Sequence, residues 1–306
     1  CTPTFSCSTH GTTASSMYVP RTAVVTAIFG AYDQLHGPPK EAAAKADFFC
    51  FTDAPLHTNL WDGAQQGWQV LRSDDHIRDN STDNGGYNSL SRGDELETQA
   101  FAMLAAKYYK VNLHRIPLLA SYDVAVWVDA AFEITAPDFV ERCNAMLGRR
   151  DFVVLRHPHA SSVEEETVRT YGHARKYRGQ RVLEQEAGYR AAGFPDDLGL
   201  WAGGFIVRSL ESPIVVAAME AWWREIQTGS YQDQLSLPYV AWRTPGFQAR
   251  MHVHQEDIYT LAGMGRWRGH SHARNIVEYT FDRRPGLGPP AAPGWPSAAA
   301  AAAAVP

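Results

Sequence analysis

The stretch GLWAGGFIVRS at residues 199–209 is an apolar, β-rich run that contains a glycine pair, Gly203 and Gly204. A glycine pair in a strand lets a ligand lie close to the backbone, because no Cβ stands in the way. Tight packing of the strand against a helix is the alternative explanation. Further along, SYQDQLSLPYV at 230–240 places Asp233 beside Gln234. A second apolar run, YDVAVWVD at 122–129, ends in the carboxylate of Asp129.

Strands and helices alternate along the chain, which predicts an α/β fold with a mostly parallel sheet flanked by helices. Ligands of such sheets bind at the carboxyl ends of the strands, where Asp33, Asp53 and Asp129 stand. The apolar patterns predict strands at Thr22–Phe29, Asp47–Thr52, Val124–Val128, Phe152–Leu155 and Phe205–Val207, and helices at Glu95–His114, Glu164–Tyr177, Leu183–Ala192 and Pro213–Ile226.

The chain has 306 residues, which is enough for one large domain or two small ones. We expect a flexible leader at 1–20, a single domain at 21–283 and a disordered Pro/Ala-rich tail at 284–306. A net charge of −5, with no long basic run, argues against nucleic acid as a partner. No stretch approaches the roughly 20 apolar residues of a transmembrane segment. The sequence begins at Cys rather than Met, so we expect any membrane anchor in a missing N-terminal part.

Seven segments, in a fixed order, resemble those of a plant and bacterial domain family associated with turgor regulation and mucilage. They are AIFGAYD (27–33), FFCFTD (48–53), AKYYKVNLHRIP (106–117), YDVAVWVDAAFEI (122–134), LRHPH (155–159), EQEAGYRAAGFPDDLGLWAGGFIVRS (184–209) and AWWREIQTGSYQDQLSLPYVAWR (221–243). The resemblance spans roughly residues 22–280. That family is similar to the nucleotide-sugar glycosyltransferases of GT-A type, which implies a Rossmann-like α/β fold, a UDP-sugar donor and a glycan acceptor.

The resemblance also implies a divalent cation, Mn²⁺ or Mg²⁺, that offsets charge on the departing diphosphate. GT-A enzymes usually hold it with a DxD motif, but here the motif position is occupied by Trp127-Val128-Asp129. Asp129 is therefore the expected metal ligand, and a simple turn after a strand is the alternative. Glycogenin-like transferases add a late histidine, for which His254 and His270 are the candidates. Structural roles for both histidines remain the alternative.

Asp233 and Gln234 resemble the DQxxLN element of glycogenin-like retaining transferases. In that role they would stabilise positive charge at the anomeric carbon or attack it. The alternative is that Asp233 caps a helix over 235–242. Lys107 and Lys110 lie three residues apart on one helix face, where they contact either solvent or a phosphate or uronate group.

The remaining candidates follow predicted strands. His157 is a candidate catalytic residue that would face the acceptor or the diphosphate. Tyr32, Asp33 and Asp53 stand where GT-A folds bind the base and ribose, and Tyr32 is suited to stack on uracil.

A retaining, metal-assisted glycosyltransferase that uses a UDP-sugar, such as UDP-galacturonate, is the leading hypothesis. A ceramidase-like metal-dependent amidase and a non-catalytic carbohydrate-binding protein are the alternatives. The amidase would need three clustered metal ligands, and the sequence has no HExxH motif. Localisation in the Golgi lumen suits a plant or algal protein, and a cytoplasmic one suits a bacterial protein. The sequence leaves open the donor sugar, the acceptor, the linkage and the oligomeric state.

Overall fold

The computed structural model describes residues 18–30, 32–53, 67–73, 95–173, 177, 180–261 and 263–270. Most of the expected leader and all of the expected tail lie outside these ranges. None of the described helices is long and apolar enough to cross a membrane.

A central sheet organises the described part of the chain, where seven strands lie in the order β3-β2-β1-β4-β7-β6-β8. Strand β7 runs antiparallel to both of its neighbours, whereas the other paired strands are parallel. The α/β class with a mostly parallel sheet is therefore confirmed. The strands are β1 (Thr22–Ile28), β2 (Asp47–Thr52), β3 (Trp68–Arg72), β4 (Val124–Val128), β6 (Phe152–Arg156), β7 (Trp201–Ser209) and β8 (Met251–His254).

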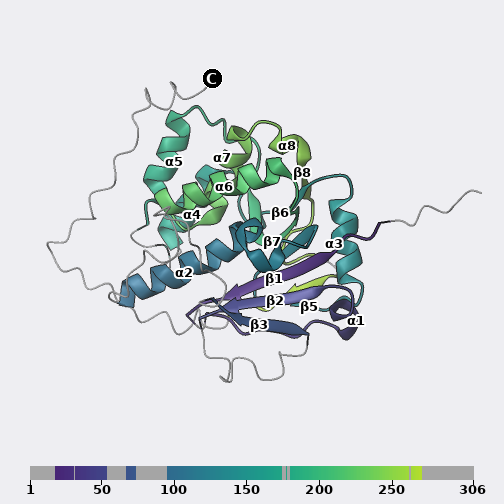
Figure 1. Ribbon diagram of the computed structural model, residues 1–306. Helices are drawn as coiled ribbons and strands as arrows, with labels where there is room; N and C mark the ends of the chain where they lie inside the picture. The colour runs from purple at the N-terminus through teal and green to yellow at the C-terminus, as the bar shows by residue number, and fades with distance from the viewer. Residues whose placement is uncertain are drawn as a thin grey trace, which may run out of the picture.

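Helices cover both faces of this sheet (Figure 1). Alternate residues of β1 point to opposite faces, so Val25 packs in one buried cluster and Val24 in the other. The first cluster includes residues of α2 (Glu95–Val111), α6 (Pro213–Thr228) and α7 (Asp233–Arg243). The second includes α1 (Lys40–Ala43), α3 (Phe139–Leu147) and a small antiparallel pair, β5 (Phe132–Ile134) with β9 (Gly265–Trp267).

A third, smaller cluster joins α7 to α4 (Val163–His173) and α5 (Val182–Ala191). The remaining elements are α8 (Phe247–Arg250) and two 3₁₀ turns, at Leu113–Arg115 and Pro117–Leu119. Helix α4 begins under the carboxylate of Asp196, which accepts hydrogen bonds from the backbone N–H groups of Val163 and Glu164 at 2.8 and 2.9 Å. Ser162, directly before the helix, adds a third acceptor, because its hydroxyl accepts the backbone N–H of Glu165 at 3.1 Å.

The antiparallel direction of β7 determines where the functional residues meet. Its first residues lie at the edge where β1, β4 and β6 end, with Phe205 opposite Val128 and Trp201 opposite Arg156. The pairing with β6 shifts register between Val154 and Leu155, which leaves the glycine pair in an irregular part of the strand. The glycine pair of β7 and the end of β4, about 75 residues apart in sequence, are therefore brought side by side at one edge of the sheet.

Candidate active site

An open cleft lies at this edge and contains about 570 Å³ of empty space. Its walls come from the end of β1, the C-terminal half of α2 and the end of β4. The polar and aromatic side chains that line it are Tyr32, Asp33, Lys107, Lys110, Trp127, Asp129 and His270. The strand-end position of the predicted ligand site is therefore where a cleft is found, as the rule for parallel sheets requires.

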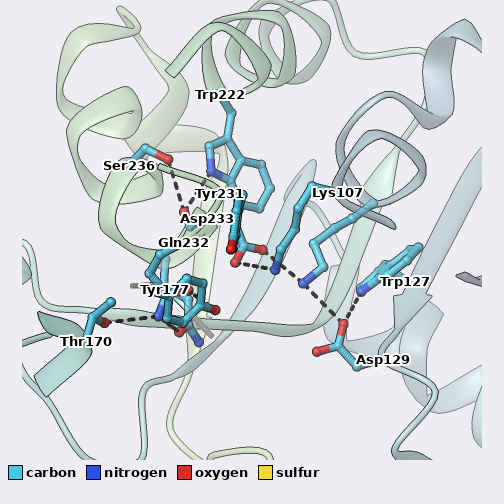
Figure 2. A network of polar contacts seen from close by, with 12 residues as sticks. Lys107, Trp127, Asp129, Thr170, Tyr177, Trp222, Tyr231, Gln232, Asp233 and Ser236 are labelled. Carbon is cyan, nitrogen blue, oxygen red and sulfur yellow. Dashed lines mark hydrogen bonds and ion pairs between the residues drawn. The ribbon is translucent and has the colours of Figure 1, made fainter. Parts of the chain in front are cut away.

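Two lysines and two aspartates form a charged cluster beside the cleft (Figure 2). Lys107 Nζ lies 2.7 Å from one carboxylate oxygen of Asp233, and Lys110 Nζ lies 2.9 Å from the other. Lys110 Nζ also lies 3.2 Å from Asp129 Oδ1. Helix α2 thus presents both ammonium groups to carboxylates that follow it by up to 126 residues. The two positive and two negative charges balance one another.

Burial and these ion pairs oppose each other in setting the protonation of the cluster. Burial acts to raise the pKa of Asp233, but the ammonium groups of Lys107 and Lys110 outweigh it and hold the pKa well below its ordinary value. The pKa of Asp129 is lowered in the same way, against burial, by the same two lysines. Both carboxylates are therefore ionised at neutral pH.

The two lysines shift in opposite directions. Burial lowers the pKa of Lys107 to about 8, although Asp233 opposes this. For Lys110, burial is outweighed by Asp129 and Asp233 together, and its pKa is raised. Lys110 is therefore the permanent cation of the cluster, and Lys107 the one that can lose its proton in a mildly alkaline medium.

Asp233 is the first residue of α7, and its backbone is fixed independently of its side chain. The indole Nε1 of Trp222 and the hydroxyl of Ser236 both donate to its carbonyl oxygen, at 2.9 and 3.2 Å (Figure 2). Its carboxylate, meanwhile, accepts from the two lysines. The side chain thus serves the lysine cluster, which is not the helix-capping role that was the alternative.

The glycine pair leaves room for the two carboxylates. A Cβ built on Gly203 would lie 3.0 Å from Asp233 Oδ2 and 3.5 Å from Lys110 Nζ. A Cβ built on Gly204 would lie 3.2 Å from Asp129 Oδ2. The carbonyl of Gly204 also accepts a hydrogen bond from the backbone N–H of Asp129 at 2.8 Å. These contacts explain the two glycines through the charged cluster; contact with a ligand stays a prediction.

A second group of side chains that line the cleft is aromatic and acidic. His270 Nδ1 lies 2.9 Å from Asp33 Oδ2, and the His270 ring lies 4.9 Å from the Tyr32 ring. Asp53, by contrast, is exposed and does not line the cleft. Its carboxylate accepts from the backbone N–H of Gly30 at 3.0 Å, where φ is +61°. Asp53 therefore shapes the turn after β1 and bounds the cleft only indirectly.

His157 and Gln234 belong to a separate polar network beside the lysine cluster. His157 is buried, and its Nδ1 accepts from the backbone N–H of Ala160 at 2.9 Å. Burial lowers its pKa to about 4, so the ring is neutral at physiological pH. Gln232 Nε2 lies 3.2 Å from Gln234 Oε1 and 2.8 Å from Glu166 Oε1, whose carboxylate faces His157. His157 does not line the cleft.

A divalent cation at Asp129 would need several further ligands. No three His, Cys, Asp or Glu side chains that could hold a metal ion come together in the described ranges. His270 pairs with Asp33, while His254 lies on edge strand β8, 3.2 Å from Glu256. Asp129 Oδ1 already faces the Lys110 ammonium group and accepts from the Trp127 indole at 2.8 Å. The described residues around Asp129 therefore do not fit a protein-held divalent cation.

A buried arginine fixes the last turn of α2, where Lys110 stands. Arg208 of β7 is 1% exposed and donates to the carbonyl oxygens of Lys110 and, at 3.2 Å, Val111. These are carbonyls at a helix C-terminus, which attract a cation. Arg208, Trp127, Trp222 and Gln232 were not among the candidates predicted from the sequence. Among these four, only Trp222 has a signal in the sequence, the adjoining pair Trp222-Trp223, because such large aromatic side chains are often packed in a core.

Comparison with known proteins gives a family but no close relative. A family model described as "TOD1/MUCI70, glycosyltransferase-like domain" matches residues 6–260. No curated protein matches the sequence. The match to the family model confirms the resemblance drawn from the sequence motifs.

Three solved structures are similar to the chain. WbbM, a bifunctional glycosyltransferase in its apo form, shares 13% identity with a TM-score of 0.44, and the match covers 78% of this chain and 40% of WbbM. Core-mannan synthase A (CmsA/Ktr4) from Aspergillus fumigatus, in its Mn/GDP form, shares 8% identity with a TM-score of 0.43, covering 78% of this chain and 74% of that one. Mouse xyloside xylosyltransferase 1, in its apo form, shares 13% identity with a TM-score of 0.43, covering 77% and 85%. The chain thus spans less than half the length of WbbM.

Proposed function

Because the chain belongs to the TOD1/MUCI70 glycosyltransferase-like domain family, we propose that it transfers a sugar from a nucleotide-sugar donor to a hydroxyl group of a glycan. One observation carries the proposal. Lys107 and Lys110 line a cleft at the ligand-binding edge of the sheet and are held there by the buried carboxylate of Asp233 and the partly exposed carboxylate of Asp129. Fixed ammonium groups of this kind suit a diphosphate that gains negative charge as it leaves.

Two groups of side chains that line the cleft match two parts of the donor. Tyr32, Asp33 and His270 offer aromatic faces and a carboxylate, which suit a base and a ribose. The lysine pair suits the diphosphate. We propose UDP as the nucleotide and a uronic acid such as galacturonate as the sugar, following the family resemblance of the sequence motifs.

In the proposed reaction, the bond between the anomeric carbon and the diphosphate oxygen breaks. The acceptor oxygen forms a bond to the same carbon, and the acceptor hydroxyl gives its proton to the departing diphosphate. Lys107 and Lys110 stabilise the charge that develops on the leaving group. Because the His157 side chain does not line the cleft, we give it no part in moving this proton.

Asp233 is proposed to act in two stages. Its side chain is 3% exposed, and both of its oxygens are taken by lysines. A bound diphosphate competes for these ammonium groups, and a carboxylate oxygen freed in this way can stabilise positive charge at the anomeric carbon. Gln234 adjoins it on α7, half-buried, and is proposed to support the same charge. Retention of configuration follows if the acceptor attacks from the face that the diphosphate leaves.

The test is release of nucleoside diphosphate from a panel of UDP- and GDP-sugars in the presence of oligosaccharide acceptors, with mass spectrometry of the product. Asp233→Asn should lower turnover by roughly a hundredfold or more. Asp138→Asn is the matched control, because Asp138 is a half-exposed acid paired with Arg142 on the surface. Melting temperatures of both variants show whether the loss reflects unfolding.

Two outcomes would contradict the proposal. A folded wild-type protein that binds glycans, with equal affinity in both variants, and never releases nucleotide would be a carbohydrate-binding protein. Turnover that is equal in Asp233→Asn and the wild type would remove Asp233 from the mechanism. The anomeric configuration of the product, followed by NMR, tests retention separately.

A further inference from the structure

We propose that the ammonium groups of Lys107 and Lys110 take the place of the divalent cation at the donor diphosphate, so that the nucleotide binds without a metal ion. This inference rests on the proposed function, because it concerns the same cleft and the same donor. It explains why the described residues around Asp129 do not form a metal site. It also gives a reason for the incomplete DxD motif, since the two lysines would do the work of the metal ion that a complete motif holds.

Trp127 occupies the position at which the first carboxylate of a DxD motif would stand. Its side chain is 2% exposed, and its indole Nε1 donates to Asp129 Oδ1 at 2.8 Å. Its ring lies 5.5 Å from Lys110 Nζ, within the range in which an aromatic face attracts a cation. A carboxylate here would supply a metal ligand. An indole instead orients Asp129 and favours a monovalent ammonium group next to it.

Lys110 stands where it can serve both carboxylates and the cleft. Its Nζ lies 3.2 Å from Asp129 and 2.9 Å from Asp233, and its side chain is 4% exposed. A divalent ion bound to Asp129 would share one carboxylate with this ammonium group in a poorly solvated place, and the two cations would repel each other. Moving Lys110 away would leave Asp233 with Lys107 alone. The cluster therefore favours the lysine over a metal.

The same geometry suits a diphosphate. Lys107 and Lys110 line the cleft, while Asp233 does not. Asp233 thus holds both lysines from outside the cleft, and the ammonium groups have donors left for phosphate oxygens, because each carries three N–H bonds. Lysine is an ordinary phosphate ligand, and two of them supply the two positive charges that one divalent cation would bring.

The experiment is calorimetric titration of the purified chain with UDP, once with EDTA and once with MnCl₂, together with an electron paramagnetic resonance titration of Mn²⁺. We expect the Kd for UDP to agree within roughly twofold between the two conditions, and Mn²⁺ alone to bind no tighter to the protein than to buffer. Lys110→Met should weaken UDP binding in EDTA by roughly ten- to a hundredfold, the loss of a charged hydrogen bond. Lys45→Met is the matched control, because Lys45 is a half-exposed lysine paired with Glu141 outside the cleft.

Each outcome decides the question. UDP binding that requires Mn²⁺ overturns the inference and leaves the proposed transferase standing. Absence of UDP binding in both conditions, joined by absence of turnover with every donor in the panel, removes the proposed function and the inference with it. Metal-free binding that is unchanged in both Lys110→Met and Lys107→Met also overturns the inference. If Lys110→Met fails to fold, the wild-type comparison and Lys107→Met still decide, because Lys107 is the more exposed of the two lysines.

Discussion

Adding one methyl group at residue 203 should disturb the charged cluster without touching any charged residue. In Gly203→Ala the new Cβ would lie 3.0 Å from Asp233 Oδ2. Asp233 cannot easily retreat, because both of its oxygens are held by lysines at 2.7 and 2.9 Å. The φ of Gly203 is not among the positive values in the chain, so the whole effect comes from space and none from backbone strain.

The magnitude follows from two opposing contributions. Overpacking a buried site costs about 1–3 kcal/mol. Replacing glycine by alanine also restricts the unfolded chain, which offsets about 0.4–1 kcal/mol. The net loss of about 1–2 kcal/mol corresponds to a melting temperature lower by roughly 2–4 °C for a chain of this size. Displacement of the lysine cluster by a few tenths of an ångström should also lower kcat/KM for the donor, by roughly tenfold.

Differential scanning fluorimetry and the donor-turnover assay measure these two quantities on the same preparations. Gly188→Ala is the matched control, because Gly188 lies within α5 and a Cβ there would meet nothing within 4 Å. This control should gain about 0.5–1 kcal/mol, the helix preference of alanine, with unchanged turnover. The reasoning would be refuted by a Gly203→Ala protein whose UDP affinity and turnover match those of the wild type.

Three further predictions concern residues around the site. Because the Lys107 pKa lies at about 8, its positive charge is lost as pH rises, so UDP affinity should fall between pH 7 and pH 9. Calorimetry across this range should find a flatter pH profile of UDP affinity in Lys107→Arg, because the arginine side chain stays charged. Arg208→Leu would remove the arginine donor from the backbone carbonyls of Lys110 and Val111. Urea unfolding should therefore reveal a free energy of unfolding lower by about 2–5 kcal/mol, and UDP affinity should fall as well. Unchanged UDP affinity would show that Arg208 does not position Lys110. Asp196→Ala removes the acceptor of two backbone N–H groups in the first turn of α4 and should cost about 1–2 kcal/mol in the same unfolding assay, while a change in UDP affinity would contradict its purely structural role.

The sequence predicts strands well where they are continuous apolar runs. The predicted bounds of β2 and β4 equal the observed ones, and β1 differs by one residue at its end. The direction of β7 could not be predicted, because a strand buried on both faces has no alternation that distinguishes one direction from the other. That direction is what brings Gly203 and Gly204 to the same edge as Asp129.

Position after a strand predicts the edge of the sheet but not which side chain faces the cleft. Asp129, Asp53 and His157 all follow strands, yet only Asp129 lines the cleft. Backbone N–H groups from nearby turns occupy Asp53 and His157. Such local hydrogen bonds depend on turn geometry that residue types alone do not determine. The ion pairs of Lys107 and Lys110 with Asp233 could not be predicted from the sequence either, since Asp233 lies more than 120 residues further along the chain.

The buried contact between Arg208 and the end of α2 joins residues 97 and 98 apart in sequence. At a synthesis rate of about 5–20 residues per second, Arg208 is therefore added to the chain roughly 5–20 s after the last turn of α2, which it holds in the folded protein. Asp233 follows later still. Until then Lys107 and Lys110 have no carboxylate from α7, and burying them would be costly. The charged cluster is thus among the last parts of the described fold that a nascent chain can complete, and a translation product that ends before residue 233 carries the lysines without the acid that anchors them.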